Sequence, residues 1–315
     1  MKIGIDIMGG DYAPESTIQG SILAYNQLPE NIRIVLIGNK EIIVKICEEN
    51  NFDPKNFEII NSLEMIEMGE HPSKAFSNKP NSSIAIGFNM LKTDKIQGFA
   101  GAGNTGAMMV GAIYSVRSIP GIIRPTIAAA LPKENGKSTI ILDVGLNPDC
   151  RPDVLYQYAI LGSIYAENVY SIDNPRVGLL NIGSEEEKGN LLTKSTYELM
   201  KGTIDFNFIG NVEGNDFFNN GKVDVVICDG FVGNVIIKEA EAFYSLIKKR
   251  NKSDEYFDLF NFEHYGGTPI LGINSPVVVG HGISNGEAIK NMILHTKEVV
   301  EANLCKKIKG AFNNG

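Results

Sequence analysis

The chain has 315 residues, of which 43% are apolar, so it can bury a large core as one α/β domain or as two closely packed lobes. Its formal net charge of -8 argues against nucleic acid as a partner, because neutralising phosphates requires a basic stripe. The four cysteines lie far apart, without a CxxC pair or histidines that would complete a zinc site, and we interpret them as buried small residues in a reducing compartment.

The ends and the hydropathy of the chain indicate where the protein resides. The N-terminus starts directly with the strand pattern MKIGIDI, without a basic and apolar leader, and no apolar run approaches the roughly 18 residues of a membrane-spanning helix. We therefore expect a cytoplasmic protein. Because no repeat or low-complexity linker divides the sequence, residues 1–315 are treated as a single α/β domain.

The first half of the chain alternates strand and helix patterns, which predicts a parallel sheet. Residues 62–81 interrupt this pattern as an irregular loop with a short helix. The expected strands span residues 3–7, 31–37, 57–60, 96–100 and 138–144, and the expected helices begin near 13 or 14 and span 41–49, 82–91, 107–116 and 153–165.

The second half continues in the same way. Strands are expected at 177–182, 206–209, 223–228 and 273–279, and helices at about 184–200, 235–249 and from 284 onward. Two capping boxes are predicted, Ser184 with Glu187 and Ser284 with Glu287, because a Ser followed three residues later by Glu satisfies two backbone donors at a helix start.

Five expected strands end in small polar turns. These are MGGD (8–11), GNTG (103–106), DVGLN (143–147), IGSEEEKGN (182–190) and DGFVGN (229–234). Ligands of open α/β sheets bind outside the carboxyl ends of the strands, and glycine turns present backbone N–H groups to anions. Together the turns predict a crevice for a phosphate-like anion. Asp6, Asp143 and Asp229 could form a metal or base set there, but we interpret them as caps of turns and helices.

The segment GAGNTG is a literal GxGxxG, so a dinucleotide fold has to be considered. That fingerprint requires an acidic residue about 20 positions later, and residues 107–133 contain no Asp or Glu. A Walker A loop is excluded because no Lys follows Gly106. We expect neither a nucleotide cofactor nor a metal.

The chain also lacks a recognisable protein nucleophile, since there is no GxSxG elbow and no cysteine in a nucleophile setting. His281 could line the crevice or serve as a hydrogen-bonded structural residue. An anion crevice of this kind suits a reaction in which phosphate itself attacks. A thioester would leave as a thiolate with a pKa of about 8.5, so no strong general acid is needed, and backbone N–H groups, a Lys and an Asn amide could stabilise the oxyanion.

At the level of motifs the chain resembles the phosphate acyltransferases of bacterial phospholipid synthesis, which are acyl-acyl-carrier-protein:phosphate transacylases. The resemblance covers nearly the whole chain and rests on DxMGGD, GNTGA, LDVGxN, VGLLNIGxExxKGN, NFIGNVEG, DGFxGN, YGG and HG in this order. It implies a three-layer α/β/α sandwich with a mainly parallel sheet, related to phosphotransacetylases and isocitrate-type dehydrogenases. It also implies transfer of a fatty acyl group from acyl carrier protein to inorganic phosphate, which feeds glycerol-3-phosphate acylation.

The resemblance carries Lys188 and Asn234 over as catalytic residues and implies a homodimer without a cofactor. An acyltransferase of the acylglycerol-phosphate pathway is a further candidate partner. The turns and motifs together assign substrate or phosphate binding to a larger set: Gly9, Gly10, Asp11, Gly103, Asn104, Thr105, Gly106, Asn147, Ser184, Gly189, Asn190, Gly233 and His281.

Residues 239–265 depart from the family pattern, because the helical hairpin expected there is shorter than in many members. Peripheral contact with the inner face of the membrane, which that hairpin is proposed to make, therefore stays open. Lys248, Lys249 and Arg250 are the densest basic run and are predicted to dock the acidic carrier protein, with a solvated helix end as the alternative. The rival activities are a phosphotransacetylase-like reaction on short acyl-CoA and an inactive scaffold that binds carrier protein or membrane.

Overall fold

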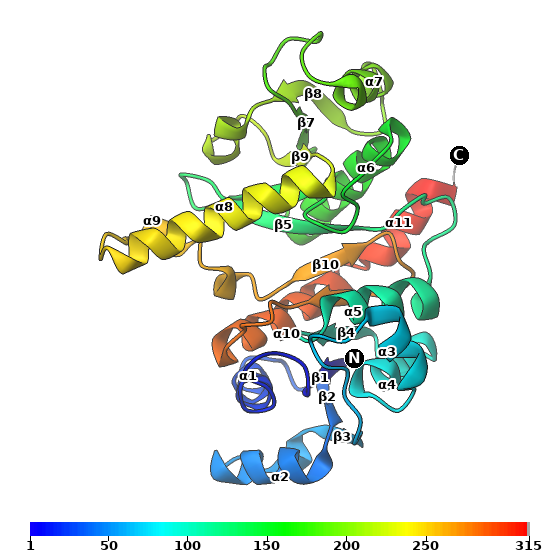
Figure 1. Cartoon of the computed structure of the whole chain (residues 1–315), viewed down its shortest axis with the longest axis vertical. Helices are drawn as coiled ribbons and strands as arrows, with labels where there is room; N and C mark the ends of the chain where they lie inside the picture. The colour runs from blue at the N-terminus through cyan, green and yellow to red at the C-terminus, as the bar shows by residue number, and fades with distance from the viewer. Residues whose placement is uncertain (314–315) are drawn as a thin grey trace. The chain divides into compact units, whose positions relative to one another are not determined.

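The computed structural model describes residues 1–313, and their contacts divide the chain into two compact units. Unit 1 comprises Met1–Ser118 and Phe262–Cys305, and unit 2 comprises Ile119–Asn261 and the C-terminal residues from Lys306. The last helix, α11 (Leu304–Asn313), contains the boundary between Cys305 and Lys306. Figure 1 shows the elements of both units. Assignment of the chain to a single domain stays a prediction.

Unit 1 contains a six-stranded sheet in the order β3-β2-β1-β4-β11-β10. All neighbouring strands run parallel except the antiparallel pair of β10 and β11. Its strands are β1 (Lys2–Asp6), β2 (Arg33–Gly38), β3 (Glu58–Asn61), β4 (Gly98–Gly101), β10 (Thr268–Leu271) and β11 (Val277–Val279). Its helices are α1 (Glu15–Tyr25), α2 (Lys40–Glu49), η1 (Pro54–Asn56), α3 (Pro72–Asn78), α4 (Ser83–Lys92), α5 (Thr105–Gly111), the π-helical η2 (Ala112–Val116), η4 (Phe262–His264) and α10 (Gly286–Glu301).

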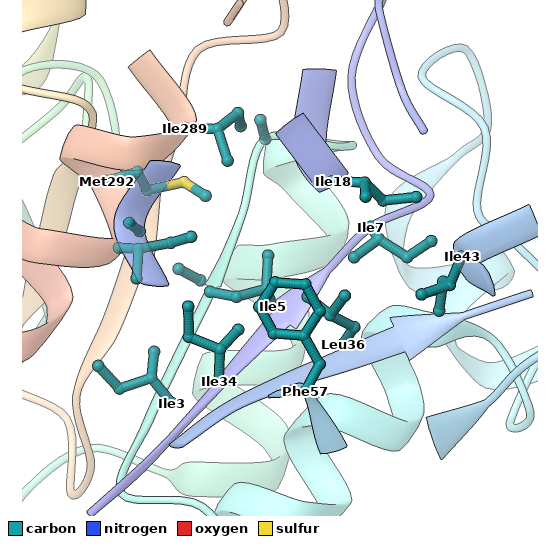
Figure 2. Packing of buried hydrophobic residues seen from close by; sticks show 14 of the residues in the cluster. Ile3, Ile5, Ile7, Ile18, Ile34, Leu36, Ile43, Phe57, Ile289 and Met292 are labelled. Atoms are coloured by element: carbon teal, nitrogen blue, oxygen red, sulfur yellow. The ribbon is translucent and has the colours of Figure 1, made fainter. Parts of the chain in front are cut away.

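Helices cover both faces of the unit 1 sheet. Alternate side chains of β1 and β2 point to one face, where they pack on α1, α2 and α10. Figure 2 shows this cluster, in which Ile3, Ile5 and Ile7 lie among Ile18 and Met292. On the opposite face α4 packs against β1, β2 and β4. This two-sided burial explains why β1 and β2 are nearly continuous apolar runs.

Unit 2 contains a five-stranded sheet in the order β5-β6-β9-β7-β8, parallel except for the pair of β5 and β6. Helix α6 covers one face, and the other face packs against α8 and η3. Its elements are β5 (Thr126–Pro132), β6 (Ser138–Leu142), α6 (Pro152–Val169), β7 (Arg176–Leu180), α7 (Leu191–Met200), β8 (Asn207–Val212), η3 (Gly214–Phe218), β9 (Val225–Ile227), α8 (Gly230–Lys249) and α9 (Glu255–Asp258). The predicted fold class, three layers around mainly parallel strands, is therefore confirmed.

Two strands and one α-helix were not predicted from the sequence. Strand β5 has the sequence TIAAALP, in which the alanines are poor strand formers, and β10 begins TP, where proline normally argues against a strand. Both are one partner of an antiparallel pair, so tertiary pairing overrides a weak local preference. Helix α11 was also not predicted. It begins at Leu304, and only Ala302 and Asn303 separate it from the end of α10.

The predicted helix starts need correction at three places. The capping box at Ser184 is wrong, because α7 begins only at Leu191 and the Asn190 side chain accepts from Thr193 N at 2.9 Å. The box at Ser284 is wrong by one residue, because Asn285 caps α10 and Ser284 donates to His281 O instead. Helix α8 starts at Gly230, five residues earlier than expected. In each case an Asn or Asp accepts from the helix backbone.

Candidate functional site

The carboxyl ends of β1, β4 and β11 lie at the same edge of the unit 1 sheet, because these strands are parallel neighbours. The turns that follow are joined by backbone hydrogen bonds. Asp11 N donates to Gly282 O at 2.8 Å, and Gly280 N donates to Gly101 O at 2.9 Å. The structure thus brings together the predicted turns of MGGD, GAGNTG and HG within unit 1.

Gly9 and Gly103 approach each other closely in this region. A Cβ atom on Gly9 would lie 2.5 Å from the Cα of Gly103, and one on Gly103 would lie 2.9 Å from the Cα of Gly9. Gly10 has φ +121°, a conformation that strongly favours glycine. Gly9 and Gly103 are buried and accept no side chain without movement of the backbone, and Gly10 is half-buried in a conformation that a side chain would strain.

Asn104 has a structural role that the motif alone did not indicate. It is buried, and its Nδ2 donates to the carbonyl oxygens of Glu67, Met68 and Glu70 at 3.0 to 3.3 Å. Its Oδ1 accepts from Ala107 N at 2.9 Å and caps α5. Asn104 therefore joins the loop of residues 62–81 to the glycine turn. This contact gives the loop a structural role that the sequence did not indicate.

The other predicted residues of unit 1 differ in exposure. Thr105 and Asp11 are exposed, whereas Gly106 packs against Pro72, where a Cβ would collide with the proline ring. The ring of His281 lies 4.9 Å from that of Phe262, centroid to centroid. The aromatic contact supports the structural interpretation of His281, although its part in substrate binding stays a prediction.

In unit 2 the segment after β7 forms a turn that presents Lys188. Lys188 is exposed, and among residues 1–313 its ammonium group has no hydrogen-bond or ion-pair partner. Gly189 follows with φ +94°, and a Cβ there would collide with Thr193 Oγ1 and Asn181 Oδ1. Ser184 is exposed in the same turn, and Asn190 caps α7. The structure therefore places Ser184, Lys188, Gly189 and Asn190 in one short segment.

Two further asparagines hold this turn and were not singled out from the sequence. Asn181 Nδ2 donates to Lys188 O at 3.1 Å, and Asn211 Nδ2 donates to Glu185 O at 2.8 Å. Asn211 is 5% exposed. Asn181 lies in the motif NIG and Asn211 in the motif NFIGNVEG, each after apolar strand residues. This position in a motif is the sequence signal that could have identified them.

A second cluster in unit 2 joins the turn after β6 to the start of α8. Asn147 Nδ2 donates to Pro125 O and Asp143 Oδ2 at 2.8 and 2.9 Å, while Asp143 also accepts from Asn147 N. Asn234 is exposed on the first turns of α8, and its Nδ2 donates to Val144 O at 3.3 Å. A Cβ on Gly233 would collide with Asp143 O, so this helix end packs directly on the turn.

The predicted capping by aspartates is confirmed. Asp229 accepts from Val232 N at 2.9 Å and caps α8, Asp143 accepts from Leu146 N at 3.2 Å, and Asp6 accepts from Met8 N at 3.1 Å. Across residues 1–313 no group of three or more His, Cys, Asp or Glu side chains is arranged to hold a metal ion.

The cysteines near these turns are protonated at neutral pH. Burial raises the pKa of Cys150 to about 11 and that of Cys228 well above its usual value. A thiol is a weak nucleophile compared with its thiolate. Cys47 and Cys228 are buried as predicted, but Cys150 and Cys305 are only half-buried, so that part of the prediction is wrong.

The predicted docking residues Lys248, Lys249 and Arg250 lie at the end of α8. Lys248 Nζ donates to Asp258 Oδ1 at 2.9 Å and lies 5.7 Å from the centre of the Tyr244 ring. Hydrogen bonding to Asp258 raises the pKa of Lys248. In the described part of the chain, no helix is both long enough and apolar enough to cross a bilayer.

Comparison with known proteins gives a consistent result. Residues 1–307 match the model of a family described as "Fatty acid synthesis protein". The chain is 41% identical to the phosphate acyltransferase of Dictyoglomus thermophilum, over 98% of this chain and 96% of the relative. It is 42% identical to the phosphate acyltransferase of Halothermothrix orenii, over 99% of both. Among solved structures, a phosphotransacetylase from Streptococcus pyogenes matches with a TM-score of 0.68 and 15% identity, over 95% of this chain and 94% of that one. The similarity to the phosphotransacetylase concerns the fold alone.

Proposed function

The chain belongs to this fatty acid synthesis family, whose similar members are phosphate acyltransferases, and from that premise we propose that it transfers a fatty acyl group from acyl carrier protein to inorganic phosphate. A phosphate oxygen attacks the thioester carbonyl carbon and forms a tetrahedral intermediate. The carbon–sulfur bond then breaks, the acyl phosphate leaves, and the carrier thiolate takes up a proton. No covalent enzyme intermediate is needed, which agrees with the protonated state of Cys150 and Cys228.

The observation that carries this proposal is the Lys188 turn. An exposed ammonium group stands on a turn fixed by Gly189 and by the Asn181 side chain, beyond the carboxyl end of β7. Because the turn is already formed, the charge costs little reorganisation when negative charge develops on the reacting groups. We propose Lys188 as the catalytic cation and Asn234 as an amide donor, since the Asn234 amide has a second N–H besides the one bonded to Val144 O.

The proposed substrate-binding residues then divide into two kinds. The amide donors of Asn104 and Asn147 already serve backbone carbonyls, so these residues would shape turns rather than contact phosphate. Gly9, Gly10 and Gly103 carry no side chains, and glycine turns of this kind bind phosphate through backbone N–H groups in other α/β proteins. We therefore propose that phosphate is held mainly by main-chain N–H groups.

The test is phosphate-dependent release of thiol from acyl carrier protein by Lys188→Ala. The turnover number is expected to fall by about a hundredfold or more, as for the loss of a transition-state charge partner. Lys188→Arg should restore it only in part, because a planar guanidinium does not replace a compact ammonium. Lys194→Ala is the matched control, since Lys194 is also exposed and lies one turn into α7. Activity of Lys188→Ala equal to that of the control would contradict the assignment.

The carrier, the oligomer and the location are proposals of the same kind. Parallel assays with acyl carrier protein and short acyl-CoA distinguish the transferase from a phosphotransacetylase-like enzyme. We propose a cytoplasmic homodimer, supported by exposed apolar side chains along α8, namely Phe231, Val235, Phe243 and Leu246. Sedimentation of the wild type and of Phe243→Ser would test the dimer. Flotation with anionic vesicles would test the alternative that this face contacts the inner membrane surface.

A further inference from the structure

Asp6 is a buried carboxyl group at the end of β1, beneath the turns just described. Asp6 is only 1% exposed. Oδ1 accepts from Met8 N at 3.1 Å, but Oδ2 has no hydrogen-bond partner among residues 1–313. Most buried side-chain oxygens in proteins have at least one partner, so the second oxygen of Asp6 calls for an explanation.

The orphan oxygen lies at the contact between the two glycine turns. A Cβ atom on Gly9 would be 2.5 Å from Asp6 Oδ2, and a Cβ atom on Gly103 would be 3.2 Å from it. The same two glycines approach each other more closely than any pair of residues with side chains could. Asp6 Oδ2 therefore lies beside both turns at the point where they meet.

The surroundings of Asp6 disfavour a negative charge. Burial raises the pKa of its carboxyl, and the neighbouring Ser83 of α4 and the hydrogen bond from Met8 N lower it by less. Neither Asp6 Oδ2 nor Ser83 Oγ has a well-aligned partner, so the contribution of Ser83 is weak. The groups that set the pKa carry no charge, so there is no cation to stabilise an ionised Asp6. Its carboxyl therefore stays neutral to a higher pH than that of an ordinary aspartate.

We propose that Asp6 is a positioning residue for phosphate, whose neutral carboxyl sets the spacing of the Gly9 and Gly103 turns and whose ionisation weakens phosphate binding. The inference rests on the proposed function, in which these turns hold the anion. A carboxylate beneath them would repel phosphate across a region of low dielectric, whereas a neutral acid would not. If Asp6 only capped its turn, its charge state would have no effect on phosphate.

The decisive variant is Asp6→Asn, which keeps the size and the acceptor for Met8 N but cannot ionise. The Michaelis constant for phosphate and the turnover number are measured across the whole pH range in which the protein stays folded, because phosphate titrates identically for all variants. Asp11 and His281 lie on the same turns and are the same in every variant, so they do not contribute to differences between the variants. Relative to Asp6→Asn, the wild type should lose phosphate affinity as pH rises, by at least about threefold at the alkaline end.

Three comparisons complete the experiment. Asp6→Ala removes the spacer, so its Michaelis constant for phosphate should rise about tenfold, with a smaller change in turnover number. Ser83→Ala removes only the weak contribution of the Ser83 hydroxyl to the pKa of Asp6, so the alkaline loss should move slightly, and only to higher pH. Asp53→Asn is the control, because Asp53 makes the same kind of bond, to Lys55 N at 3.0 Å, from an exposed position.

The outcomes separate the inference from the function on which it rests. Identical pH profiles for the wild type and Asp6→Asn overturn the role of Asp6, provided that the wild type shows phosphate-dependent thiol release. A wild type without that activity overturns the proposed function instead. If Asp6→Asn does not fold, the Asp6→Ala profile decides, because that variant cannot ionise at this position either, and a wild-type pH profile parallel to it is equally incompatible with the proposal.

Discussion

Replacing Asp224 by Asn should destabilise unit 2 more than any exposed charge change. Asp224 accepts from Lys133 Nζ at 2.8 Å, from Arg176 Nε and Nη2 at 2.8 and 2.9 Å, and from Arg176 N at 3.0 Å. The side chains of Lys133 and Asp224 are only 4% and 9% exposed. The variant leaves the Lys133 ammonium buried without a counter-charge.

The magnitude follows from what remains after the change. Removing one partner of a buried ion pair costs about 3–5 kcal/mol of unfolding free energy, and the lower end applies here because the Arg176 side chain is 32% exposed and can turn to water. Lys133→Met should lower the free energy of unfolding by less, because Asp224 keeps its ion pair with Arg176. Asp153→Asn serves as control: its pair with Arg151 is exposed and should contribute about 0–1 kcal/mol.

The assay is urea unfolding, followed at several pH values. Burial acts to raise the pKa of Asp224, but the hydrogen bonds from Arg176 and Lys133 outweigh it and hold the pKa well below its usual range. The pKa of Asp224 is thus lower in the folded protein than in the unfolded chain. The contribution of Asp224 to the free energy of unfolding is therefore complete above the unfolded pKa of about 3.9 and is lost as pH falls through the folded pKa. The difference between wild type and Asp224→Asn should be constant from neutral pH to about pH 5 and shrink below it. A difference no larger than that of Asp153→Asn at neutral pH would refute the reasoning.

Two further predictions concern the candidate site. Gly189→Ala should lower the turnover number about tenfold or more at unchanged far-UV circular dichroism, because φ +94° and the collision with Asn181 displace the Lys188 turn. Gly202→Ala, with φ +75° and open space around it, should leave turnover unchanged. Charge reversal of Lys248, Lys249 and Arg250 should raise the Michaelis constant for acyl carrier protein far more than that for phosphate, with a smaller effect at high salt. An unchanged constant at low salt would place docking elsewhere.

The sequence predicted where the turns of the candidate site lie because glycine and proline mark them and because strands covered on both faces are long apolar runs. It could not predict which residue begins each helix. Ser184 and Asn190 are both acceptable caps by type, and the choice depends on Gly189, whose positive φ ends the turn immediately before Asn190. Likewise the segment DGFVGN looks like a loop, yet Gly233 belongs to α8 because it packs on Asp143 O.

Long-range polar contacts were beyond prediction for a different reason. Asp224 is 48 residues from Arg176 and 91 residues from Lys133, and no local pattern marks either partner. The same holds for Asn104, which joins carbonyl oxygens 34 to 37 residues earlier in the chain. Such bonds depend on the completed fold, because they form only once distant strands and loops are adjacent.

The ion pair between Lys248 and Asp258 changes how the basic run should be tested. A lysine already bonded to a carboxylate contributes little additional attraction to an acidic carrier, since the pair is nearly neutral at a distance. Lys249 and Arg250 would then supply most of the attraction, whereas reversing Lys248 would also expose Asp258 and add repulsion. Separate variants resolve this: Lys249→Ala with Arg250→Ala should weaken carrier binding, and Asp258→Asn should strengthen it by releasing Lys248. If Asp258→Asn leaves the Michaelis constant for the carrier unchanged at low salt, Lys248 does not face the carrier.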